Sequence, residues 1–138
     1  MKTRIVIIKL RALIVRHGKC LLLQCSGQSK NYGKWECPGG KPHAHESLVD
    51  ALIRETKEET GLVIRPQKYF GTSVFRKDNR DIVSIYYLCQ AKGNVKVSKE
   101  HVAFAWASPQ TMYYYQFTNK QHNALMMTWA KTRLKKCT

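Results

Sequence analysis

The segment "GGKPHAHESLVDALIRETKEETGL", residues 39–62, holds an unusual concentration of glutamate. The chain has only nine acidic residues among 138, against 24 basic ones. Four glutamates fall in this one segment: Glu46, Glu55, Glu58 and Glu59. A cluster of carboxylates in an otherwise basic chain indicates a functional site.

The same segment has the hydrophobic periodicity of an α-helix over residues 46–60. Four residues spaced i, i+3, i+4 and i+7 predict one stripe that faces the core: Val49, Leu52, Ile53 and Thr56. Gly61 then stands where a helix C-cap glycine would stand. At about 100° per residue, the last three glutamates are predicted to lie beside this stripe rather than within it.

Glutamates this close together on a helix repel one another. One explanation is a solvated face whose charge is compensated by Arg54 and Lys57. The other is a bound divalent cation, because Mg²⁺ takes oxygen ligands from a few carboxylates, from water and from substrate phosphates. The rigid Pro-Gly-Gly turn at residues 38–40 favours the metal site.

Strand patterns precede and follow the predicted helix. Residues 4–25 are rich in β-branched and aliphatic side chains around a turn at Gly18, which predicts a β-hairpin. Residues 62–76 and 81–93 are predicted strands joined by the turn "KDNR". Residues 94–108 carry short strand patterns around a polar loop.

A terminal helix is predicted to begin at the capping candidates Thr118 and Asn119 and to end on basic residues. No repeat, linker or low-complexity tract divides the chain. We therefore expect a single α+β domain over residues 1–138.

The formal net charge of +15 favours polyanionic partners such as nucleotides or nucleic acid. A solvated basic surface without a dedicated partner would give the same composition. The apolar N-terminus is interrupted by Lys9 and Arg11, unlike a signal peptide or a membrane span. Five cysteines without a C-x-x-C pair indicate a reducing compartment. We expect a cytoplasmic protein that does not enter the membrane.

Residues 40–62 resemble the Nudix box, G-x5-E-x7-R-E-U-x-E-E-x-G-U, in which U is bulky and usually aliphatic. Thr56 stands at the first U position, a departure that keeps β-branched bulk. The other constrained positions all match at the required spacing: Gly40, Glu46, Arg54, Glu55, Glu58, Glu59, Gly61 and Leu62. The resemblance implies the Nudix-type α/β/α sandwich with a mixed central β-sheet.

The resemblance also implies roles for individual residues. Glu58 and Glu59 would bind Mg²⁺, with Mn²⁺ as an alternative, and Glu55 would be a further ligand or the base that activates water. The carbonyl oxygen of Gly39 would be another ligand. Arg54 would orient Glu55 and keep it ionised, since a neighbouring cation favours the carboxylate.

Other positions have both a functional and a structural interpretation. Glu46 is expected to tie the loop to the helix rather than to meet metal. Glu100 would complete the metal shell, as a late-loop glutamate does in MutT-type members, or is an exposed loop residue. Asn119 would read the base or cap the terminal helix. Arg80 would contact substrate or is a turn residue, and Glu36 would contact a ribose hydroxyl or bond to backbone.

His43 and His45 form an H-x-H pair in the variable part of the box. A histidine pair suggests zinc, which usually takes four protein ligands in structural sites. No third ligand of suitable spacing accompanies this pair, so a zinc site is not expected.

The sequence thus predicts a Mg²⁺-dependent pyrophosphohydrolase of nucleoside diphosphate-linked substrates, with a MutT-like nucleoside triphosphatase favoured by the small size. Oxidised purine triphosphates, or pyrimidine triphosphates, would fit. A dinucleoside polyphosphate or ADP-ribose hydrolase remains open, as does an RNA 5′-end pyrophosphohydrolase that uses the net charge. A non-catalytic nucleotide sensor is a third alternative, although it would need no water-activating carboxylate. The oligomeric state is not determined, and strands such as "SIYYL" would permit a dimer.

Overall fold

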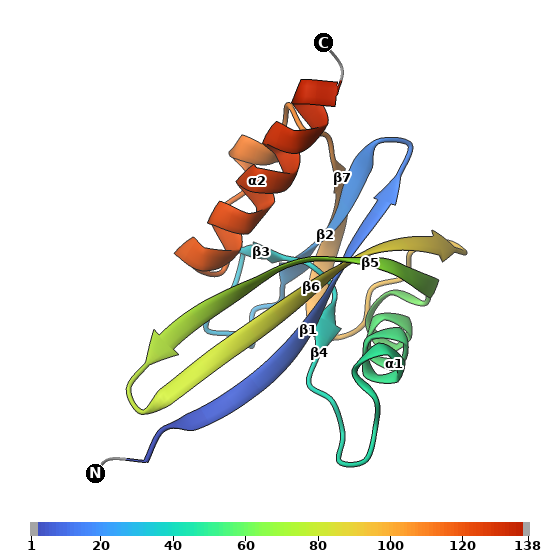
Figure 1. The fold of residues 1–138 in the computed structure, drawn as a ribbon. Helices are drawn as coiled ribbons and strands as arrows, with labels where there is room; N and C mark the ends of the chain where they lie inside the picture. The colour runs from blue at the N-terminus through green and yellow to red at the C-terminus, as the bar shows by residue number, and fades with distance from the viewer. Residues whose placement is uncertain (1–2, 137–138) are drawn as a thin grey trace.

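The computed structural model describes residues 3–136. Two helices lie on opposite sides of a group of long, twisted strands (Figure 1). The elements in chain order are β1 (Ile5–Arg16), β2 (Lys19–Cys25), β3 (Trp35–Glu36), β4 (Gly39–Gly40), α1 (Leu48–Thr60), β5 (Val63–Lys77), β6 (Arg80–Lys92), β7 (His101–Ala107), the 3₁₀ turn η1 (Met112–Tyr114) and α2 (Lys120–Lys136).

The central sheet is mixed because its first strand has a parallel partner far along the chain. β1 pairs in parallel with β6, from Ile5 against Arg80 to Ile14 against Cys89. β6 pairs antiparallel with β5, and β1 forms a hairpin with β2. The strand order is β3-β2-β1-β6-β5, with β4 added to β1 and β7 added to β2. The two predicted strand pairs are confirmed.

Successive residues of β1 pack in two different hydrophobic clusters, since successive side chains of a strand point to opposite faces of the sheet. Ala12 and Ile14 pack in one cluster with Leu52 of α1. Leu13, which lies between them, packs in the other cluster with Trp129 of α2. The layers are therefore helix, sheet and helix, which confirms the predicted sandwich.

α1 begins two residues later than predicted and has a cap at each end. The Ser47 hydroxyl accepts a hydrogen bond from the Asp50 N–H at 3.1 Å, which satisfies one free amide of the first turn. Gly61 adopts a left-handed φ of 76° and donates its N–H to the carbonyl of Lys57. The predicted C-cap is confirmed.

The predicted core-facing stripe of α1 is partly wrong. Leu52 and Thr56 are buried, but Val49 is 43% exposed. Glu59 is buried on this face instead, so it lies within the buried surface rather than beside it. The burial of a carboxylate here depends on a hydrogen bond from the Gly39 N–H.

Two further features concern the cysteines and the helices. The described cysteines, Cys20, Cys25, Cys37 and Cys89, are free and buried, while Cys137 lies outside the described residues. Within residues 3–136, neither helix combines the length and the apolar character that a membrane-spanning segment requires.

Candidate active site

Two consecutive glycines bring the backbone against the acidic helix. β4 pairs with β1, with Gly39 opposite Arg11 and Gly40 opposite Leu10. A Cβ atom on Gly39 would lie 1.8 Å from the carbonyl oxygen of Leu10. A Cβ atom on Gly40 would lie 2.6 Å from the Cδ atom of Glu55. The absence of side chains on these two residues therefore lets the loop backbone approach the carboxylates of α1.

Arg54 organises the more exposed carboxylates. Its Nε and Nη2 atoms donate to the two oxygens of Glu46 at 2.8 Å and 2.9 Å. Its Nη1 atom donates to Glu55 Oε1 at 3.0 Å and lies 3.4 Å from both oxygens of Glu58. Hydrogen bonds from Arg54 and from the His43 N–H lower the pKa of Glu46 to about 2. The charged Glu46 thus ties the loop to the helix, as predicted, and fixes the guanidinium that holds Glu55 and Glu58.

Glu59 occupies the buried side of the cluster. Its Oε1 atom accepts a hydrogen bond from the Gly39 N–H at 2.7 Å. Burial raises the pKa of Glu59 to about 8, against the lowering effects of the Gly39 N–H and of Arg11, and the charges of Glu36 and Glu100 add to the rise. Without a cation, this carboxyl group is held in surroundings that disfavour its charge.

The raised pKa of Glu59 predicts a pH-dependent stability in the absence of divalent cations. An unfolded glutamate loses its proton near its ordinary pKa of 4.5, whereas the folded chain keeps this proton to about 8. Because the folded state binds more protons in this window, the free energy of unfolding falls as the pH rises through it. Urea unfolding in EDTA at several pH values measures the fall.

The Glu59→Gln variant is the matched control, since its amide does not titrate. We expect the variant to lack this part of the fall. An equally steep fall in both proteins would show that other groups cause it.

Glu100, the last residue before β7, and His101, the first residue of β7, lie opposite Glu59. The potential ligand atoms of these three residues all lie within 4.8 Å of one another. On its other side, His101 Nε2 lies 2.9 Å from Glu36 Oε2. Arg11 Nη2 lies 3.6 Å from Glu36 Oε1. Glu100 therefore joins the acidic cluster, while Glu36 is held by two protein partners.

Arg80 lies apart from this cluster. It pairs with Ile5 in the parallel ladder, whereas Gly40 pairs with Leu10, five residues further along β1. At about 3.3 Å per residue, this separation is roughly 16 Å along the strand. The substrate contact predicted for Arg80 stays a prediction.

Asn119 caps α2, because its Oδ1 atom accepts a hydrogen bond from the His122 N–H at 2.8 Å. We expect Asn119→Ala to lower the free energy of unfolding by about 1 kcal/mol. Asn119→Asp keeps the accepting oxygen and should preserve stability. Urea unfolding of both variants tests the cap. A rise in KM for a nucleotide in the Asp variant, at unchanged stability, would instead support base recognition by the lost amide donor.

Two adjoining hollows open at the acidic cluster. They share Lys99 and Glu100 in their linings. The smaller has a volume of about 280 Å³ and is lined by Glu55, Glu58, Glu59, Ser98, Lys99 and Glu100. The larger, of about 370 Å³, is lined by Lys9, Cys25, Ser26, Gln28, Ser29, Asn31, Glu36, Lys99, Glu100 and His101. We call the larger hollow the polar chamber. A group of carboxylates thus adjoins a chamber with two lysines.

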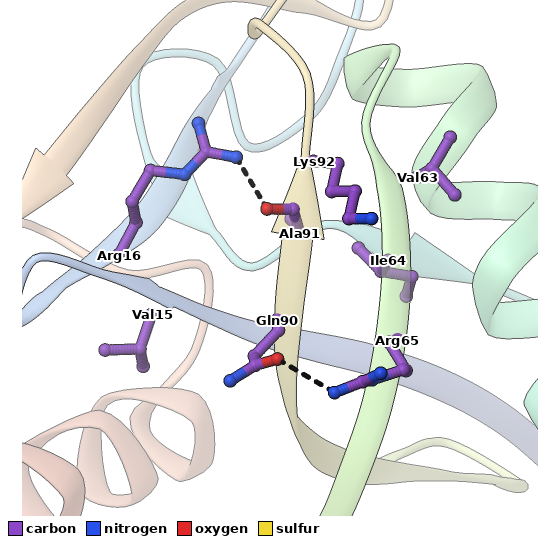
Figure 2. Close-up of a pocket in the computed structure, with 8 residues that line it drawn as sticks. All are labelled: Val15, Arg16, Val63, Ile64, Arg65, Gln90, Ala91 and Lys92. Atoms are coloured by element: carbon purple, nitrogen blue, oxygen red, sulfur yellow. Dashed lines mark hydrogen bonds between the residues drawn. The ribbon is translucent and has the colours of Figure 1, made fainter.

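A third hollow, of about 490 Å³, lies between β1, β5 and β6 (Figure 2). Its arginines are occupied: Arg16 donates to the carbonyl of Ala91 at 2.9 Å, and Arg65 donates to the side chain of Gln90 at 3.3 Å. None of the eight labelled residues that line it carries a carboxylate. This hollow therefore lacks the groups that metal-dependent chemistry requires.

Three residues in or next to the polar chamber were not predicted as site residues: Lys9, Arg11 and His101. Burial and the charge of Arg11 lower the pKa of Lys9. The two basic residues are spaced i, i+2 in an apolar strand, so they share a face of β1. That spacing was the available signal, because charges on a strand face need a partner or a function.

In this α/β/α sandwich, the short strand β4 lies against the acidic half of α1, and Arg54 binds the carboxylates there. This arrangement defines a class of enzyme. A family model of the NUDIX domain matches residues 9–130. The chain belongs to the Nudix family and is a hydrolase. This confirms the family that residues 40–62 predicted.

Named relatives agree with this placement. The chain is 34% identical over 105 residues to the CTP pyrophosphohydrolase of Escherichia coli (strain K12). The matched region covers 75% of this chain and 77% of that protein. The chain is also 29% identical over 108 residues to the 8-oxo-dGTP diphosphatase of Buchnera aphidicola subsp. Schizaphis graminum, over 76% and 79% of the two chains. The crystal structure of the MutT protein from Methanosarcina mazei Go1 matches with a TM-score of 0.84 and 29% identity, over 96% of this chain and 98% of that chain.

Proposed function

We propose that the protein is a divalent-cation-dependent pyrophosphohydrolase of nucleoside triphosphates. The observation that carries the proposal is the convergence of Glu55, Glu58 and Glu59 with Glu100 around one hollow. Two relatives are named for the hydrolysis of nucleoside triphosphates, CTP and 8-oxo-dGTP. An acidic cluster beside the polar chamber, which has two lysines in its lining, suits the cleavage of a polyphosphate.

The donor set of the cluster fits a hard divalent cation. Carboxylate oxygens of Glu55, Glu58, Glu59 and Glu100, together with the Gly39 carbonyl, would hold Mg²⁺ or Mn²⁺. When bound, such an ion neutralises phosphate charge and lowers the pKa of bound water. The raised pKa of Glu59 supports this assignment, because a buried carboxylate is stabilised by a nearby cation.

The residues of the chain itself supply position and proton transfer. Arg54 holds Glu55 and Glu58 in place through its Nη1 atom. Glu55 is proposed to accept a proton from water as the water oxygen bonds to phosphorus. The bridging P–O bond breaks, its electron pair stays with the leaving phosphate, and the proton returns to solvent or to that phosphate. Lys9 and Lys99 would hold the remaining phosphate charge in the polar chamber.

The test is a panel of substrates with Mg²⁺ or Mn²⁺ and identification of the products by mass. The panel contains CTP, 8-oxo-dGTP, the other nucleoside triphosphates, ADP-ribose, a dinucleoside polyphosphate and 5′-triphosphorylated RNA. We expect hydrolysis of a triphosphate to a shorter nucleotide plus phosphate or pyrophosphate. Binding of a nucleotide without turnover of any substrate would contradict the proposal and would indicate a sensor.

The net charge of +15 favours a second candidate, an RNA 5′-end pyrophosphohydrolase. Several lysine and arginine contacts to RNA release counterions together, so that activity would fall steeply with salt. Activity on a free triphosphate would change far less over the same range. Preference for RNA at low salt, lost at high salt, would select this candidate over the first.

A further inference from the structure

His101 is a buried imidazole with one occupied and one unoccupied nitrogen. Its side chain is 1% exposed. Nε2 lies 2.9 Å from Glu36 Oε2, within hydrogen-bonding distance. Nδ1 is one of only two buried side-chain nitrogen or oxygen atoms that lack a hydrogen-bond partner among residues 3–136. Buried polar atoms are nearly always satisfied, so an unsatisfied one on the wall of a cleft indicates a missing partner.

The contact with Glu36 determines which nitrogen can bind a ligand. Arg11 Nη2 lies 3.6 Å from Glu36 Oε1, and a cation this close favours the ionised carboxylate. An ionised carboxylate only accepts hydrogen bonds, so Nε2 carries the hydrogen and donates it to Glu36. In this tautomer of the ring, Nδ1 carries the lone pair. Histidines that bind metal commonly donate their other N–H to a carboxylate in this way.

The separation between Nδ1 and Glu59 is compatible with an ion bound between them. Nδ1 lies 3.9 Å from Glu59 Oε2, which is too long for an N–H···O hydrogen bond. An ion at about 2.1 Å from each of two ligands can span up to roughly 4.2 Å between them. Glu59 has a free oxygen for this position, because Gly39 occupies the other one. Glu100 completes a trio of ligand atoms within 4.8 Å of one another.

We propose that His101 Nδ1 is a nitrogen ligand which, with Glu59 and Glu100, forms a subsite that prefers a transition-metal dication to Mg²⁺. Imidazole suits transition metals, and N/O sites bind divalent ions more tightly along the series from Mn²⁺ to Cu²⁺. Mg²⁺ prefers oxygen ligands and retains its water. The inference deepens the proposed metal-dependent hydrolysis, and ion binding can be measured without any turnover.

A neighbouring grouping of potential ligands is a weaker candidate. Cys25, Glu36 and His101 also lie within 4.8 Å of one another. Burial raises the pKa of Cys25 to about 11, so it remains a thiol near neutral pH, and metals bind the thiolate. In this grouping Nε2 is already used by Glu36. The free nitrogen faces the carboxylates instead.

The experiment is a titration of the full chain with Mn²⁺, followed by electron paramagnetic resonance, and with Mg²⁺ by competition. Pulsed measurement of the Mn²⁺ complex detects the magnetic coupling of an imidazole ¹⁴N bound to the ion. We expect this coupling in the unmodified protein. His101→Gln, whose amide can still reach Glu36, should abolish the coupling and weaken Mn²⁺ binding by more than about 10-fold. The affinity for Mg²⁺ should fall much less.

Two controls separate ligation from structural damage. His101→Asn places an amide oxygen near the position of Nδ1, so it should restore part of the Mn²⁺ affinity without nitrogen coupling. His43→Gln changes an exposed histidine of the H-x-H pair and should leave the coupling unchanged. Melting temperatures confirm that each variant is folded.

Absence of nitrogen coupling in the unmodified protein would overturn the proposal, as would an equal loss of Mn²⁺ and Mg²⁺ affinity in folded His101→Gln. The proposed function fails separately. Nitrogen coupling without hydrolysis of any substrate contradicts the enzyme assignment and leaves the ion site standing, whereas hydrolysis without coupling does the reverse.

Discussion

Replacing Glu58 with glutamine is expected to lower kcat/KM for nucleoside triphosphate hydrolysis by more than about 100-fold. Loss of a residue that merely supports a metal ligand typically costs 10- to 100-fold, and loss of a ligand itself should cost more. The Glu58 side chain is 58% exposed, and its contacts to Arg54 are long, at 3.4 Å. The fold therefore does not depend on this carboxylate, and the melting temperature should stay unchanged. Steady-state kinetics with saturating Mg²⁺ measures the effect.

Asp50→Asn is the matched control for this substitution. Asp50 is an exposed acid in the first turn of the same helix, outside the acidic cluster. Its replacement removes the same charge and should leave kcat/KM close to the parental value. Near-parental turnover of Glu58→Gln would show that Glu58 does not bind the catalytic metal.

The second large effect concerns stability, at Gly39. Its φ of 148° is rare for residues with a side chain, and a Cβ atom would lie 1.8 Å from the Leu10 carbonyl oxygen. Gly39→Ala must therefore push β4 away from β1, and it disturbs the hydrogen bond that the Gly39 N–H donates to Glu59. We expect a loss of more than about 3 kcal/mol in the free energy of unfolding, since strain and a broken buried hydrogen bond combine. Urea unfolding measures the loss.

Gly18→Ala is a control that separates the cost of a positive φ from the cost of the close approach between strands. Gly18 also has a positive φ, of 75°, but a Cβ atom there would meet nothing within 4 Å. The control therefore carries only the backbone cost, about 1 kcal/mol. A Gly39→Ala variant no less stable than Gly18→Ala would contradict the close approach of β4 to β1.

Local patterns predicted the elements because their causes are local. The position of Gly61 as a cap depended on the few residues before it, and the hairpin at Gly18 depended on two adjoining apolar runs. The orientation of α1 was harder to predict. Val49 is exposed although it is apolar, and Glu59 is buried although it is acidic. The burial of Glu59 is possible because the N–H of Gly39, 20 residues away in the sequence, donates a hydrogen bond to it.

The acidic side of the site was predictable from one continuous segment, whereas the contacts among the residues on the other side were not. Arg11, Glu36 and His101 come from three different strands, and only the pairing of β2 with β3 and β7 brings the last two together. A lone histidine after Glu100 carries no local pattern. Its importance follows from which of its nitrogens has a partner, and that is a property of the folded chain.

The parallel pairing of β1 with β6 has a consequence for biosynthesis. During synthesis, β1 must wait for its parallel partner β6 until α1 and β5 have been made, since Ile5 pairs with Arg80. Such distant pairing slows folding and leaves apolar strands uncovered in the meantime. A nascent chain arrested before residue 80 would present the unpaired edge of β1 to other chains, so aggregation or chaperone capture should be greatest at that stage.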